Sequence, residues 1–497
     1  MKPSDIIFNL FIVAATVCLL AFLFFLNSAP GILRVIMALV LLAVSGEVLR
    51  ARNKLQGAAG LVMLKTKVGI NLINRTSRKN PNAWRFFADW GLAVSFGLLS
   101  YLLFRKRMNK WAFVLGIATL IFIIIVVFPA TILAINVINI PQVQSAAGPA
   151  LSCISQAYNP AAFAASIPYS VTDMLLVIVS LVGGLALVIP FFIILNAGSI
   201  LYAIAGSIPS AAAGNYSTTY NAINSQVPGV APLIPGITIP LAAGIITLFI
   251  LLAIHEFSHG VLSRISKVRV KSTGLLLFGI IPIGAFVEPD EKKTRKLGKV
   301  EQNRISVAGV SANLVATLVF FAMTMLFLAF VLPYITQSSI VVIGTIRGYP
   351  AYNVIPPGSV LVSINNITLG STTALAALES RLGQGAGVAV RTENATYYMK
   401  TGSGGKLGVF LCNSSVVNPA APLGPEIYFI YIVVILSLLL NFSVAAVNLL
   451  PLPGLDGWRI YSLELGGAGA RKLLYAIGII MLFALIVNLL PLLTYII

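Results

Sequence analysis

Long apolar runs recur along the chain, and they constrain its fold more than any other feature. A helix needs roughly 20 mostly apolar residues to cross a bilayer. Runs near that length lie at about 6–26, 31–49, 87–104, 111–135, 172–196, 238–260, 304–333, 427–450 and 471–495. Hydrophobic residues form 58% of the chain and charged residues only 9%, too few charges for the surface of a soluble protein. We therefore predict a polytopic α-helical membrane protein.

Three of these runs leave the number of N-terminal spans open. The run at 87–104 is short and has basic segments on both sides, which favours a re-entrant segment over a span. The run at 172–196 contains Pro190 and is expected to be kinked or to form half of a hairpin. The run at 6–26 is long for a signal-peptide core, and we interpret it as a retained anchor.

The charge pattern predicts the orientation of the spans. The formal net charge is +19, and the basic residues gather between the apolar runs, as the positive-inside rule requires. The segment 261–303 is rich in Lys and Arg and is predicted to be cytoplasmic, whereas 206–237 has no charge and is predicted to be external. The run at 238–260 therefore ends near the cytoplasmic face. No nucleic-acid-binding motif is visible, so nucleic acid is excluded as a partner.

The segment 338–412 differs from the rest of the chain. Short Val- and Ile-rich runs are broken by Gly, Pro and Asn, which predicts strands and turns, with a helix at Thr372–Leu382 and a hairpin around Glu393 and Asn394. The stretch GYPAYNVIPPGSVLVSINN resembles the PDZ family, with Ser359 at the usual Asp and Asn366 at the usual Gly. We expect a small PDZ-like α/β domain on the extracytoplasmic side.

The stretch LLAIHEFSHG, at the end of the run 238–260, contains His255 and His259, and the chain has 2 histidines in all. Residues four apart share one face of a helix, so both imidazoles can bind one metal ion while Glu256 reaches its open side. This is the H-E-x-x-H spacing of zinc hydrolases. An ionisable side chain within the bilayer is costly, which favours a functional role over simple packing.

A catalytic zinc site usually takes three protein ligands, so a third ligand is needed. It must be Asp, Glu or Cys, because no histidine remains. Cys18, Cys153 and Cys412 are too scattered for a thiolate site. Asp456 lies in NLLPLPGLDGW between apolar runs, where Pro and Gly break the helix at membrane depth, and such backbone lines protein or water. The other candidates among the acids are Glu288, Asp290, Glu291 and Glu464.

Together these motifs resemble the site-2 protease family of intramembrane zinc metalloproteases. The family pairs H-E-x-x-H on one membrane helix with N-x-x-P-x-x-x-x-D-G on a later one, here His255–His259 and Asn448–Gly457. GIIPIGAFVEPDE, residues 279–291, is similar to its membrane-associated β-hairpin, which pairs with extended substrate. AGVSAN, residues 308–313, is similar to its A-G-P-x-x-N, with Val310 in place of Pro.

The resemblance implies both the site and the reaction. His255, His259 and Asp456 would bind one zinc ion per chain, and Glu256 would act as the general base for attack by a metal-activated water. Asn313 and Asn448 would donate hydrogen bonds to the substrate or the oxyanion. The implied partners are the lipid bilayer and membrane proteins with a transmembrane segment, which are cut in regulated intramembrane proteolysis. The expected location is a prokaryotic cell membrane, with the active site toward the cytoplasm.

The sequence thus predicts four regions: an N-terminal transmembrane region of unknown role (1–237), a protease core with the H-E-x-x-H helix, hairpin and following span (238–333), the PDZ-like domain (338–412), and a C-terminal membrane core (424–497). Two other classes stay open: a catalytically silent scaffold that binds partners through the PDZ-like domain, and a metal or proton transporter. The intact Glu256 argues against the first, and the lack of a visible inverted repeat against the second. The natural substrate, an upstream protease, the oligomeric state and any pairing of Cys153 with Cys412 are not indicated.

Overall fold

The computed structural model of the chain describes most of its residues. These are 3–25, 31–104, 108–131 and 171–493, apart from 227, 231–232, 234, 236–238, 347, 357, 370–374, 376–377, 379–380 and 419–420. The predicted polytopic helical class is confirmed, because seven helices in the described ranges are long and apolar enough to span a membrane. They lie at Ile6–Leu23, Lys110–Thr131, Val177–Ala212, Leu241–Ile265, Lys299–Ile335, Gly424–Asn448 and Ala468–Leu492.

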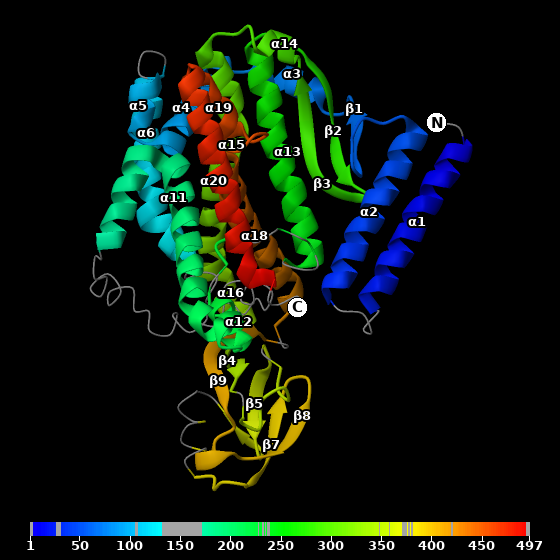
Figure 1. The fold of residues 1–497 in the computed structure, drawn as a ribbon, viewed down its shortest axis with the longest axis vertical. Helices are drawn as coiled ribbons and strands as arrows, with labels where there is room; N and C mark the ends of the chain where they lie inside the picture. Colours follow the sequence, from blue (N-terminus) through cyan, green and yellow to red (C-terminus); the bar gives the residue numbers. More distant parts are fainter. Residues whose placement is uncertain are drawn as a thin grey trace.

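The N-terminal half is mainly helical. Its elements are α1 (Pro3–Phe25), α2 (Gly31–Asn53), β1 (Leu61–Thr66), α3 (Ile70–Arg78), α4 (Pro81–Phe96), α5 (Leu99–Phe104), α6 (Lys110–Phe122), a π-helical turn (Ile123–Val127), α11 (Val171–Ala212) and α12 (Tyr216–Asn224). The pair α1–α2 stands at one side of the molecule, and β1 joins it to the remainder (Figure 1).

The run at 87–104 is not a continuous helix, which favours the re-entrant alternative. It is divided between α4 and α5 at Gly97, whose φ is 54°. A Cβ at Gly97 would lie 2.4 Å from the carbonyl oxygen of Leu181 in α11, so the break occurs where two backbones meet. Figure 1 shows α5 and the start of α6 at the same end of the molecule as α3. The basic residues of α3 before this run and Lys110, which begins α6 after it, therefore lie at one end.

The predicted kink in the fifth run has a different position from Pro190. The helical path of α11 is interrupted at Gly184, where φ is 60° and ψ is −159°. A side chain there would meet the carbonyl oxygen of Ser95 at 2.4 Å, so glycine is needed for this close approach to α4.

The membrane core is formed by the C-terminal helices. They are α13 (Leu241–Ile265), α15 (Lys299–Leu326), a π-helical turn (Phe327–Val331), α16 (Leu332–Ile335), α18 (Gly424–Asn448), α19 (Asp456–Glu464) and α20 (Ala468–Leu493). α15 packs against α13, α18, α19 and α4, so it lies at the centre of the bundle. The largest apolar cluster joins α4, α6, α15 and α18, which attaches part of the N-terminal half to this core.

A three-stranded antiparallel sheet lies between α2 and α13 (Figure 1). Its strands are β1, β2 (Val270–Phe278) and β3 (Ile281–Pro289), in the order β1-β2-β3, and the short α14 (Glu291–Thr294) follows. β3 is the edge strand on the α13 side, and its residue Val287 pairs with Thr273 of β2. The segment that we expected to form a hairpin, 279–291, supplies β3 and its turn.

A six-stranded sheet occupies the end of the molecule opposite α3 and α14 (Figure 1). Its strands are β4 (Thr336–Thr345), β5 (Val360–Ile364), β6 (Ile367–Thr368), β7 (Gly387–Thr392), β8 (Thr396–Lys400) and β9 (Val409–Val417), with a 3-10 turn at Ser403–Gly405. They extend slightly beyond the predicted 338–412. The hairpin around Glu393 is confirmed by the pairing of β7 with β8. The helix expected at Thr372–Leu382 falls mainly outside the described residues, and the likeness to PDZ domains stays a prediction.

Candidate metal centre

Two imidazoles of α13 form one side of a buried polar cluster. His255 and His259 are one helical turn apart, so both rings project from the same face, and they are 7% and 8% exposed. Their Nε2 atoms are 3.2 Å apart. This distance is short for two nitrogens that each seek a hydrogen-bond donor, and a shared cation would satisfy both.

The start of α19 brings a carboxylate to the same point. The chain leaves α18 at Asn448, turns through the Pro- and Gly-rich segment, and enters α19 at Asp456. A Cβ at Gly457 would lie 2.5 Å from the carbonyl oxygen of Leu449, so only glycine allows α19 to begin this close to α18. The broken helix thereby places a buried carboxylate at the histidines.

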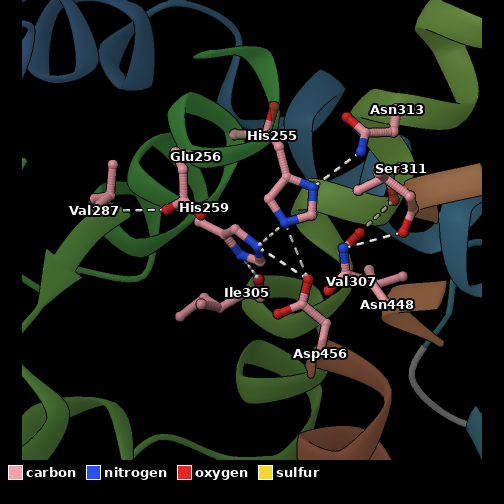
Figure 2. Close-up of polar contacts among 12 residues, drawn as sticks. His255, Glu256, His259, Val287, Ile305, Val307, Ser311, Asn313, Asn448 and Asp456 are labelled. Carbon is pink, nitrogen blue, oxygen red and sulfur yellow. Dashed lines mark hydrogen bonds and ion pairs between the residues drawn. The ribbon is translucent and has the colours of Figure 1, made fainter. Parts of the chain in front are cut away.

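The three side chains converge as metal ligands do. Asp456 Oδ2 lies 3.2 Å from His259 Nε2 and 3.4 Å from His255 Nε2 (Figure 2). One ligand atom from each residue falls within 4.8 Å of the other two, and all three residues are buried. Two neutral imidazoles and a carboxylate are a donor set that zinc accepts, and three protein ligands leave a fourth position open. The residues therefore fit a catalytic zinc ion.

The outer nitrogen of His259 supports the same assignment. Nδ1 lies 2.7 Å from the carbonyl oxygen of Ile305 in α15. A carbonyl oxygen can only accept, so Nδ1 carries the proton and Nε2 presents its lone pair to the cluster. A hydrogen bond of this kind commonly fixes the tautomer and ring orientation of a metal-binding histidine.

Asn313 fulfils the corresponding role for His255. Its amide lies 3.1 Å from Nδ1, on the opposite side of the ring from Asp456 (Figure 2). The amide oxygen has no partner among the described residues. Turning the amide by 180° would let this oxygen accept from Nδ1–H, which leaves His255 Nε2 free for a metal. The predicted contact of Asn313 with substrate or oxyanion stays a prediction.

Gly309 of α15 makes room for the first imidazole. A Cβ at this position would lie 2.3 Å from His255 Nε2 and 2.4 Å from its Cε1. α15 runs without interruption through residues 308–313, so Val310 in place of the family's Pro leaves the helix intact. The glycine of the AGVSAN motif thus lets α15 approach α13 closely enough to contact both histidines.

The side chain of Glu256 contacts the edge strand β3, whereas the two histidines contact α15 and Asp456. Its carboxylate accepts a hydrogen bond of 2.7 Å from the main-chain N–H of Val287 in the edge strand β3 (Figure 2). The residue is half-buried, whereas the three metal-ligand candidates are buried. The carboxylate therefore lies between the metal cluster and the free edge of the sheet.

The other acids considered as third ligands have partners elsewhere. Lys65 and Ser272 bond to Glu288 and hold the pKa of its carboxyl below the usual value. Glu464 accepts from Asn303. Asp290 caps α14, and Glu291 pairs with Arg295 on the surface.

Asn448 makes a local contact. It donates to the carbonyl of Val444 within α18 at 3.0 Å. Within the described part of the chain, no hydrogen bond joins it to the histidines or to Asp456, and its predicted contact with substrate stays a prediction. Sequence reasoning missed the roles of Ile305 and Gly309: a main-chain carbonyl gives no residue-type signal, and the glycine was noted only as part of a motif.

The fold and the cluster define a multi-pass membrane protein with a buried His-His-Asp group of the kind found in metallopeptidases. Residues 243–485 match peptidase family M50, the site-2 protease family, whose members are membrane zinc metalloproteases. The resemblance seen in the sequence is confirmed for this part of the chain. An uncharacterized protein of Methanocaldococcus jannaschii is 30% identical over 232 residues, which are 46% of this chain. The matched region spans 58% of that relative's length.

Proposed function

We propose that this protein is a zinc endopeptidase that cleaves the transmembrane segments of membrane proteins. The observation that carries the proposal is the convergence of His255, His259 and Asp456 from two separate helices, beside the carboxylate of Glu256. The match to peptidase family M50 supports the same reaction class. In this proposal the three converging residues hold one zinc ion per chain, and Glu256 is the general base.

When bound, the zinc ion would polarise a peptide carbonyl and lower the pKa of water at its open position. The protein's own groups prepare the site for this chemistry. The Ile305 carbonyl and the Asn313 amide hold the two imidazoles in the tautomer that binds metal. Glu256 takes a proton from the attacking water and passes it to the leaving nitrogen as the C–N bond breaks.

The edge strand β3 is the proposed site for the substrate backbone. A helical substrate hides its carbonyls in i to i−4 hydrogen bonds, so it must become extended before hydrolysis. An extended segment can add to a free sheet edge through main-chain hydrogen bonds. The bond between Val287 and Glu256 supports this assignment, because it brings the outward edge of β3 within reach of the base.

The six-stranded sheet is proposed to screen substrates on the extracytoplasmic side, as a PDZ-like domain. It lies at the opposite end of the molecule from α3 and α14, whose surroundings are rich in Lys and Arg (Figure 1). By the positive-inside rule, the basic end is cytoplasmic. The same rule places the metal cluster in the cytoplasmic half of α13, and regulated intramembrane proteolysis is the process that this arrangement suits.

A comparison of the wild type with Glu256→Gln tests the proposal. The purified proteins are assayed for bound zinc and for cleavage of a single-span test substrate. We expect zinc in both and a loss of cleavage of at least about 10²-fold in the variant. Glu47→Gln, which alters a carboxylate paired with Arg50 within α2, serves as the matched control and should cleave normally.

Each other result has a definite meaning. Cleavage by Glu256→Gln at the wild-type rate would remove the assigned base. A wild type that holds zinc and binds membrane partners without cutting them would favour the scaffold. Zinc or proton flux through reconstituted vesicles, without cleavage, would favour the transporter.

A further inference from the structure

One turn of α15 contacts both of the helices that carry the candidate ligands. We name Glu301–Ile305 the junction turn. Its Ile305 carbonyl accepts from His259 Nδ1 at 2.7 Å, and its Asn303 amide donates to Glu464 of α19 at 2.7 Å. α19 begins with the candidate ligand Asp456 and ends at Glu464. The junction turn is therefore bonded to a candidate ligand of α13 and to the last residue of α19. Its position should therefore influence the distance between His259 and Asp456.

The same turn is anchored to the N-terminal region through a buried ion pair. Asp89 of α4 is 1% exposed and receives two hydrogen bonds of 2.8 Å from the Arg304 guanidinium. A bidentate pair of this kind fixes orientation as well as distance, because both groups are planar. Asp89 also accepts from the main-chain N–H of Asn109 at 3.0 Å, so the carboxylate is held from two sides.

Further bonds extend this network to the end of α13. Arg304 donates to Glu301 at 2.9 Å, and Glu301 accepts from Ser266, which follows the last residue of α13, at 2.8 Å. The junction turn thus has polar contacts with α4, α13 and α19. Asp89 lies outside residues 243–485, the part of the chain that matches the protease family.

We propose that Asp89 is a positioning residue of the metal centre. The N-terminal helix α4 holds Arg304, and with it the junction turn, in the orientation that aims the Ile305 carbonyl at His259 and keeps α19 in place. The proposal rests on the proposed function only in that the metal is taken to be zinc. The proposal gives a role in the metal centre to the N-terminal region 1–237, for which the sequence indicated none. Loss of a hydrogen bond to a metal-binding histidine typically weakens metal binding by about 10–100-fold, and Asp89 acts on such a bond through Arg304 and Ile305.

Metal binding by Asp89→Asn tests this assignment without any peptidase assay. Zinc affinity is measured by competition with a chelator, and the visible absorption of the cobalt-loaded protein reports the ligand geometry. We expect zinc binding about 10–100-fold weaker than in the wild type, with an altered cobalt spectrum. Leu120→Ala is the control for general destabilisation: this buried α6 side chain belongs to the same apolar cluster as α4. It should lower thermal stability and leave both metal readouts unchanged.

A second variant covers the case in which the single one does not fold. Asp89→Asn leaves the Arg304 charge buried without its carboxylate, so it is paired with the double variant Asp89→Asn with Arg304→Gln, which removes both charges. The double variant should fold and bind zinc about 10-fold more weakly than the wild type. Wild-type zinc affinity and cobalt spectrum in either folded variant would overturn the proposal. A wild-type protein that binds no metal would instead refute the proposed function.

Discussion

The metal centre and the six-stranded sheet differ in the reach of their buried polar groups. Around the metal centre, polar side chains bond across long stretches of sequence: 46 residues from His259 to Ile305, 197 from His259 to Asp456, and 215 from Arg304 to Asp89. In the sheet, the buried hydroxyls of Thr392 and Thr401 bond to main chain only 3 and 18 residues away.

The difference reflects what holds each region together. The interior of the sheet is almost entirely aliphatic, as in Ile340, Ile355 and Ile364, and burial of that surface from water stabilises it. Helices in a bilayer gain no such driving force against each other, because lipid is as apolar as their side chains. Packing and polar contacts then decide how the helices sit. Substitutions of the polar groups that join helices around the metal centre should therefore affect that centre, whereas substitutions in the sheet affect only local stability.

The largest effect is expected from the carboxylate that joins α19 to α13. Asp456→Asn keeps the size of the side chain but removes the charge, and two imidazoles alone should not retain zinc through purification. In the sheet, Ile364→Ala should lower the stability of that region by about 2–5 kcal/mol and leave the zinc content unchanged. Elemental analysis and thermal unfolding of both variants check the contrast. Zinc retained by Asp456→Asn at the wild-type level would contradict it.

Gly309→Ala is expected to have the next largest effect. The new methyl group would overlap His255 at 2.3 Å, and the ring cannot move away without leaving the cluster. We expect zinc affinity to fall by about 100-fold, at the upper end of outer-contact effects. Gly344→Ala in β4 is the matched control, because its nearest neighbour would be Phe410 at an ordinary 3.5 Å. Equal zinc affinities of the two variants would show that the close approach of α15 is unimportant.

A smaller effect should follow from Asn313→Leu. The substitution leaves Nδ1–H of His255 buried without an acceptor, which weakens the preference for the metal-binding tautomer. Zinc affinity should fall by about 10-fold. Asn441→Leu changes another buried amide, which bonds at 2.7 Å within its own helix, and should leave the affinity unchanged. Chelator competition measures both, and a reversed order of the two effects would argue against the role given to Asn313.

The smallest effect is expected where a long-range polar contact lies at the surface. Lys65 and Glu288 join β1 to β3 across 223 residues at 2.7 Å, but both are partly exposed, and such pairs contribute little. The hydrogen bond from Lys65 lowers the folded-state pKa of Glu288 from its usual value. The contribution to stability is therefore present above the unfolded-state pKa and is lost as pH falls through the folded-state value.

Hydrogen exchange of the β1 amides checks this prediction. Protection in the wild type should decrease slightly as pH falls through the folded-state pKa of Glu288, after correction for the intrinsic exchange rate. Glu288→Gln should show the lower protection already at neutral pH and little further change. A large loss of protection, or loss of zinc, would contradict the prediction. It would mean that the importance of a polar contact depends more on the sequence separation of its partners than on their burial.

The sequence could indicate the three candidate metal ligands because their signal is local or energetically costly. The spacing of His255 and His259 specifies one helical face, and a carboxylate amid broken helix at membrane depth singles out Asp456. Most spans could be predicted for a similar reason, since hydropathy reports the bilayer directly. The break at Gly97 could not, because its cause is the backbone of α11 at Leu181, far away in the sequence.

The surroundings of the ligands were much less accessible to sequence reasoning. Asn313 was noticed within a motif, but only the fold shows that its amide lies against Nδ1 of His255. Asp89 had a visible signal, an acid within an apolar run, yet nothing in its own segment indicates Arg304 as the partner. Contacts between helices depend on packing, which periodicity does not encode.

The hydrogen bond from Val287 to Glu256 also bears on where a substrate would be cut. Val287 directs its main-chain N–H away from β2, and neighbouring outward groups follow at every second residue of an antiparallel strand. A peptide laid along β3 would therefore advance past the carboxylate in steps of two residues. The peptide bond that is cut would then depend on the register of the peptide relative to β3. Shifting a target sequence by one residue would turn its side chains to the other face of the sheet.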